Sequence, residues 1–188
     1  VLLERNTGKS IDSPKNPLIL SVYPSHFDNL NDGIPPIINI GLNDETVEGL
    51  ADSYHRPKFA YLTYLRFVAE FSETILDVDF PLIDQQVTRF MSLKRVHQLI
   101  DLELKDILEL CSILKNLPVQ FKNIEFPENT LDQLEMVILK QMSLWQRESL
   151  VDYRRSVEID DAFGLSLIVR EQKFSNLGED SADIKILT

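Results

Sequence analysis

The chain has 188 residues, of which 44% are hydrophobic and 26% charged, proportions that exclude a disordered or fibrous protein. Its 30 acidic residues outweigh 19 basic ones and give a formal net charge of -11, which disfavours direct contact with nucleic acid or an anionic membrane. The single cysteine, Cys111, excludes an intrachain disulfide and fits a reducing compartment, so we expect an intracellular protein, nuclear or cytoplasmic.

Residues 1–42 have a different pattern from the rest of the chain. Two short apolar or β-branched runs, 18–23 and 37–40, predict strands, and the turn sequence at 31–33 lies between them. The two runs form either a hairpin or an extended arm that lies along a partner. Prolines exclude a long helix through this region: Pro14, Pro17, Pro24, Pro35 and Pro36.

The next two elements are predicted helices. Asn43 suits the N-cap of a short helix that ends near Ala51, because its side chain can accept a backbone hydrogen bond. Pro57 then opens a stronger helix, since proline is favoured in the first helical turn. Apolar side chains cover more than half of the circumference over 59–71, so we expect this helix at the centre of a bundle.

A third helical segment is predicted over 82–117, after Pro81. Unbroken, it would be about 36 residues and about 54 Å long, so we expect a kink near Ser92. Its core face is marked by apolar residues at steps of three, four and seven: Val96, Leu99, Ile100, Ile107, Leu110, Leu114 and Leu117.

The last long helix is predicted to start at Thr130, where residues 130–133 match a capping box, and to end near Val157. Strand-like runs follow at 165–169 and 184–187, so a small sheet could join both ends of the chain. The expected fold is mainly α, a helical bundle of four to five helices with short strands from both termini. We divide it into an extended arm, a helical bundle and a strand-like C-terminal segment, at 1–42, 43–157 and 158–188.

Three features match parts of chemical sites. The Gly-Lys-Ser at 8–10 matches the end of a phosphate-binding loop, but Leu3 stands where the motif requires glycine. Asp77 and Asp79 pair two carboxylates, yet they lie between predicted helices, where capping explains them. An internal zinc site is not expected, because the histidines are far apart: His26, His55 and His97. We therefore predict no catalytic residue, no cofactor and no metal.

Two basic clusters remain, one on the third helical segment and one on the last helix. Either is a candidate patch for a phosphate or an acidic peptide, and the alternative is a solvated helix face balanced by neighbouring acids. Neither has the interleaved aromatic residues that stack on bases. The candidate residues are Arg89, Lys94, Arg95, Arg154 and Arg155.

The chain also has more apolar and aromatic helix surface than a three-helix body readily buries, which favours a partner-binding surface. The alternative is that the bundle and its sheet consume all of it. The sequence thus predicts a non-catalytic interaction subunit or adaptor of a larger multiprotein assembly, with a nucleic-acid-associated factor as the alternative. An enzyme with a site built from scattered residues is a third possibility. The predicted partner-binding residues are Leu18, Leu20, Tyr23, Tyr61, Tyr64, Phe67 and Trp145.

Overall fold

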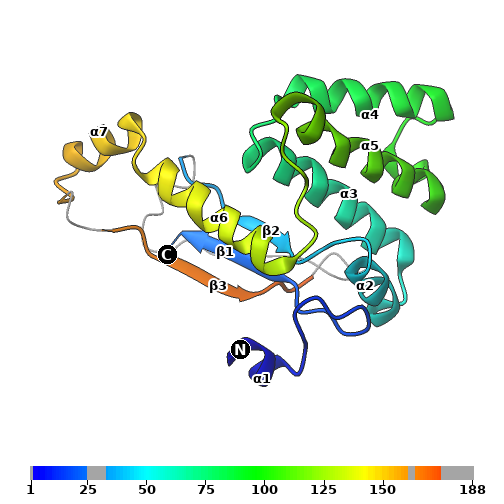
Figure 1. Cartoon of the computed structure of the whole chain (residues 1–188), viewed down its shortest axis with the longest axis horizontal. Coiled ribbons are helices and arrows are strands. Elements are labelled where there is room, and N and C mark those ends of the chain that lie inside the picture. Colours follow the sequence, from blue (N-terminus) through cyan, green and yellow to red (C-terminus); the bar gives the residue numbers. More distant parts are fainter. Residues whose placement is uncertain (1, 25–32, 161–163, 175–188) are drawn as a thin grey trace.

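The computed structural model describes residues 2–24, 33–160 and 164–174, and these form seven α-helices, one 3-10 helix and three strands. The fold is mainly helical with a small antiparallel sheet, as the sequence predicts. Figure 1 shows helices α2 to α5 gathered in one part, and the sheet with α6 and α7 in the other. The helices are α1 Leu2–Thr7, α2 Thr46–Tyr54, α3 Pro57–Thr74, α4 Phe80–Lys94, η2 Leu99–Asp101, α5 Leu104–Lys122, α6 Thr130–Trp145 and α7 Glu148–Ser156.

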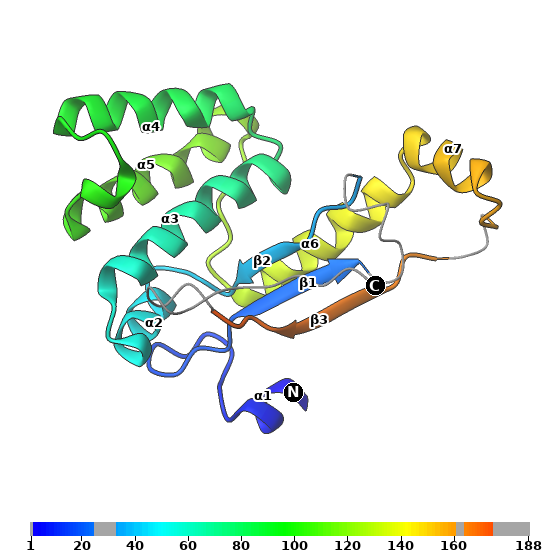
Figure 2. The same cartoon turned by 180° about the vertical axis from the view of Figure 1, so that it is seen from behind.

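The three strands are β1 (Leu20–Pro24), β2 (Ile37–Ile40) and β3 (Leu167–Glu171), in the order β2-β1-β3. Both neighbours of β1 are antiparallel to it, and Val22 pairs with Val169 in β3. The expectation that the two ends of the chain share a sheet is confirmed for these strands. Helix α6 runs along the sheet (Figure 2). The predicted strand at 184–187 lies outside the described residues.

Helix α3 is the centre of the helical part, as its apolar circumference predicts. It packs against α2, α4 and α5. Tyr64, Phe67 and Phe71 are all buried, and the rings of Phe67 and Phe71 lie 5.3 Å apart with Phe126 against both. Burial of such aromatic side chains gives the largest apolar contribution per residue to folding.

The segment predicted as one kinked helix is two helices, α4 and α5, separated by η2. Helix α4 ends at Lys94, and Arg95 adopts the left-handed conformation with φ of 58°, while its N–H bonds to the carbonyls of Met91 and Ser92. The kink predicted near Ser92 is therefore a complete reversal, which lets both helices bury their apolar faces. Helix α5 also continues past its predicted end, through the buried Pro118.

The last long helix is also divided in two. Helix α6 ends at Trp145, and α7 starts at Glu148 after a break at Gln146. The N-cap of α6 is Asn129, whose side-chain oxygen accepts from the N–H groups of Leu131 and Asp132. The N-cap thus lies one residue before the predicted Thr130, and Gln133 does not complete the predicted capping box, because its side chain bonds to Gly41 and Leu42.

Candidate functional site

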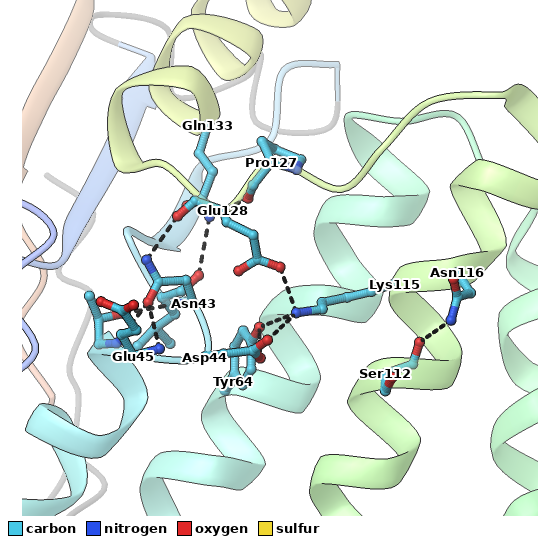
Figure 3. A network of polar contacts seen from close by, with 12 residues as sticks. Asn43, Asp44, Glu45, Tyr64, Ser112, Lys115, Asn116, Pro127, Glu128 and Gln133 are labelled. Carbon is cyan, nitrogen blue, oxygen red and sulfur yellow. Dashed lines mark hydrogen bonds and ion pairs between the residues drawn. The ribbon is translucent and has the colours of Figure 1, made fainter.

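A half-buried lysine joins the two parts of the molecule. Nζ of Lys115 on α5 donates to Oδ2 of Asp44 at 2.8 Å, to Oε1 of Glu128 at 2.5 Å and to the hydroxyl of Tyr64 at 3.2 Å. The Tyr64 hydroxyl donates to Oδ1 of Asp44 at 2.9 Å. Figure 3 shows these four side chains converging from α3, α5 and the two loops that lead to α2 and α6. We call Asp44, Tyr64, Lys115 and Glu128 the Lys115 hub.

The charge state of the hub argues against a chemical role for its lysine. Burial of the ammonium lowers the pKa of Lys115, but the hydrogen bonds that it donates to Asp44 and Glu128, with the charges of both acids, outweigh this effect, so the net pKa is raised. Burial, then the charges of Glu128 and Asp44, raise the pKa of Tyr64 strongly. Both groups keep their protons near neutral pH, and neither is suited to act as a general base or nucleophile.

Amide side chains extend the hub toward the sheet. Oε1 of Gln133 accepts from the N–H of Gly41 at 2.7 Å, and its Nε2 donates to the carbonyls of Leu42 and Pro127. Nδ2 of Asn43 donates to the carbonyl of Glu128 at 2.8 Å (Figure 3). Because these bonds tie the end of β2 to the start of α6, the hub and the amides fix the helical part to the sheet part.

An acidic hollow of about 450 Å³ lies beside the hub. At its rim Asp12 accepts from the N–H and hydroxyl of Thr130 and from Nδ2 of Asn129, and so holds the start of α6. Within the described part of the chain, no group of three or more histidine, cysteine or acidic side chains is placed to hold a metal ion. The residues that line the hollow are Asp12, Asn43, Asp44, Glu45, Glu128 and Asn129.

A second concave surface, on another face of α3, has the opposite charge. It consists of two hollows of about 510 and 330 Å³ that share Leu62, Arg66 and Ile100. Their walls come from α3, η2, α4 and α5, and they include three cationic side chains but no carboxylate. We call this surface the α3 groove; its lining residues are Arg56, Pro57, Lys58, Phe59, Leu62, Thr63, Leu65, Arg66, Ala69, Val87, Leu99, Ile100 and Leu114.

Most of the residues predicted to bind a partner lie inside the chain. Tyr23 and Tyr61 are half-buried. The other five residues are packed inside the fold, as in the alternative that the bundle and its sheet bury the surplus apolar surface. A role for these five in partner binding stays a prediction. These five are buried: Leu18, Leu20, Tyr64, Phe67 and Trp145.

The predicted basic patches are not continuous cationic surfaces. Lys94 contacts Asp106 and Glu109, at 2.7 Å each. Arg154 is buried, with its guanidinium 4.0 Å from the centre of the Trp145 ring, and its Nη1 donates to the Trp145 carbonyl. Arg155 lies 3.9 Å from Asp152. Arg89 and Arg95 are exposed.

The motif candidates also have structural explanations. Residues 2–7 are helix α1, and Lys9 pairs with Glu171 at 2.9 Å. Asp77 pairs with Lys140 at 2.6 Å. His55 and His97 are exposed in separate loops, and His26 lies outside the described residues.

Sequence reasoning missed both the hub and the groove. Lys115 is one of many lysines in helical segments, and nothing local distinguishes it. For the groove a signal was present, because Lys58, Leu62 and Arg66 recur at steps of four and therefore share one helix face.

The chain is similar along nearly its whole length to part of several enzymes, although no protein-family profile matches it. It is 32% identical over 183 residues to a pyruvate, phosphate dikinase of Entamoeba histolytica and 31% identical over 180 residues to one of Clostridium symbiosum. It is 29% identical over 181 residues to pyruvate, phosphate dikinase 2 of rice, Oryza sativa. These matches cover 95–96% of the chain but only 20–21% of the relatives, so the chain spans about a fifth of their length.

These similarities correct the predicted function. The predictions of a non-catalytic adaptor, of a nucleic-acid-associated factor and of a protein that is not an enzyme are wrong, because the relatives are dikinases. A nuclear location, one of the two expected alternatives, is not supported either, since several relatives are named as chloroplastic enzymes. The prediction relied on the absence of complete short catalytic motifs. That absence is weak evidence, because an active site is often assembled from residues far apart in a longer chain. In the described ranges no helix has the length and apolar character needed to cross a membrane.

Proposed function

We propose that this chain is one domain of a phosphotransferase of the pyruvate, phosphate dikinase type. The observation that carries the proposal is identity of 28–32% along almost all of the chain with dikinases from an amoeba, a bacterium and plants. A match confined to about a fifth of each relative is the size of a domain within a larger enzyme. For the complete protein we propose pyruvate and phosphate as substrates, which the names of the relatives state.

The role proposed for the domain is to form a rigid part of the framework that positions the reactants. Phosphoryl transfer depends mainly on positioning and on charge stabilisation, and it needs little covalent chemistry from the protein. The Lys115 hub supports such a role, because it ties α3, α5 and both loops at one point with short charged hydrogen bonds. We also propose an intracellular location, supported by the chloroplastic relatives.

An activity assay on the natural protein that contains this sequence tests the proposal. The purified protein is incubated with pyruvate, phosphate and a nucleoside triphosphate as phosphoryl donor, and pyruvate consumption is followed. We expect consumption that requires phosphate and the donor, and none from residues 1–188 alone. A natural protein that is folded by circular dichroism, yet consumes no pyruvate under any of these conditions, would overturn the proposal.

A further inference from the structure

The α3 groove has two cations at its start and a third where its two hollows meet, with an apolar floor along it. Lys58, Leu62 and Arg66 lie on one face of α3, and the helix rises about 12 Å from the Cα atom of Lys58 to that of Arg66. Arg56 stands beside Lys58 at the start of the helix. The opposite wall is apolar and includes Ile100 of η2, whose side chain is 51% exposed.

The charge of the groove contrasts with that of the chain. Three cations and no carboxylate line it in a protein of net charge -11. The carboxylate of Glu70, one turn along α3, interacts electrostatically with Arg66 but does not line the groove. A local positive field on an acidic protein favours anionic partners at that place.

The dimensions favour an elongated ligand over a small one. From Pro57 to Ala69 the groove follows about 18 Å of helix, or about three turns. A single phosphate ion is much smaller than this surface and would leave most of its apolar floor uncovered. A short amphipathic helix could place apolar residues on the floor and carboxylates against both cationic positions.

The groove is poorly suited to nucleic acid. Its single aromatic residue is Phe59, and that ring already packs edge-on against Tyr54 and Phe174, with centroids 6.2 and 5.6 Å away. Stacking platforms for bases need aromatic faces that are free.

We propose that the α3 groove is the docking site for an acidic amphipathic helix of a partner protein. Leucine-like residues of the partner would cover Leu62 and Ile100, while its acidic residues would pair with Arg56 and Lys58 at the start of the groove and with Arg66 where the two hollows meet. The inference goes beyond the proposed function and concerns the chain by itself, so failure of the dikinase assay would leave it standing.

A fluorescent peptide tests the docking site on the full chain. The probe is a helical peptide of about twelve residues, with leucines at helical spacing and glutamates near both ends. We expect saturable binding by fluorescence anisotropy that weakens as salt is raised. A second peptide, with glutamine in place of every glutamate, should bind at least about tenfold more weakly, a loss of about 1.4 kcal/mol.

Variants locate the site. R66Q and the double variant R56Q/K58Q should each weaken binding of the acidic peptide about tenfold, and Ile100→Ser should weaken both peptides. Arg5→Gln is the matched control, because Arg5 is an exposed arginine of α1 outside the groove. Circular dichroism confirms that each variant is folded.

Three outcomes would overturn the inference. One is no saturable binding of the acidic peptide below about 1 mM. Another is equal binding by the wild-type chain and the groove variants, which would place the contact elsewhere. The third is evidence for a phosphate site. It would be either tighter binding of a single-stranded oligonucleotide than of the acidic peptide, or displacement of the peptide by pyrophosphate at lower concentration than by unlabelled peptide.

Discussion

The Lys115 hub and the α3 groove use positive charge in opposite ways, although one helix contributes to both. Tyr64 lies about 200° around α3 from Leu62, so the hub and the groove occupy different faces. In the hub the ammonium of Lys115 contacts two carboxylates, and its side chain is only 15% exposed. In the groove the cations line an open apolar surface without a carboxylate. Neutralised charge inside a fold fixes structure, whereas unbalanced charge on a concave surface favours binding.

The largest expected effect is that of K115M. The substitution leaves the carboxylates of Asp44 and Glu128 close together beside the Tyr64 hydroxyl, without the cation that they share. Because both acids are about half exposed or more, we expect a loss of about 2 kcal/mol in the free energy of unfolding, below the cost for a fully buried pair. Urea denaturation measures it. Lys122→Met, an exposed lysine of the same helix, should change stability by less than about 0.5 kcal/mol.

The next largest effect is expected at alkaline pH, where the hub should contribute less to the free energy of unfolding. The folded pKa values of Lys115 and Tyr64 are raised above 10.5 and 10.0, so the native state keeps protons that the unfolded chain releases. Their contribution is fully present at lower pH and is lost as pH rises above about 10, by at most about 1.4 kcal/mol per pH unit for each group. Urea denaturation from about pH 8 to about pH 11 covers roughly the range of the two titrations. The free energy of unfolding should decline less steeply with pH in K115M than in the wild-type chain. An identical decline would argue against the hub.

A smaller effect is expected from Tyr64→Phe. The ring stays in the core, while the hydroxyl bonds to Asp44 and Lys115 are lost. We expect a loss of about 1 kcal/mol, measured by the same urea titration. Tyr61→Phe is the matched control, because Tyr61 is half-buried outside the hub. A larger loss at Tyr61 would show that the hub bonds contribute little.

Arg66→Gln should have the smallest effect on stability. The Arg66 side chain is exposed, and its charge interacts with that of Glu70. The free energy of unfolding should therefore change by less than about 0.5 kcal/mol. Its effect should instead appear in binding of the acidic peptide. A variant that is strongly destabilised would mean that the groove arginine is structural, and the contrast with Lys115 would disappear.

Much of the fold could be predicted from local patterns. Pro57 and the apolar circumference of the following residues indicated α3 and its central position. The short β-branched runs near both ends indicated the strands that meet in one sheet. These patterns are local in sequence, and the structure retains them because the core face and the local preference agree.

The parts that could not be predicted depend on long-range contacts or on unusual backbone geometry. Arg95 takes a left-handed conformation that glycine or asparagine usually marks, so the reversal after α4 had no sequence signal. Gln133 bonds to Gly41 and Leu42 rather than serving a capping box. Lys115 acquires its role from Asp44, 71 residues away, and no sequence pattern links the two.

The strand order also has a consequence for synthesis of the chain. β1 lies between β2 and β3, and Leu20 pairs with Glu171. When the ribosome has made β1, β2 and every helix of the described residues, one edge of β1 still lacks its neighbour, because β3 follows α7. The helical part can pack earlier from contacts that are nearer in sequence. A nascent chain that stalls before β3 would therefore expose an unpaired strand edge, the kind of surface on which aggregation starts.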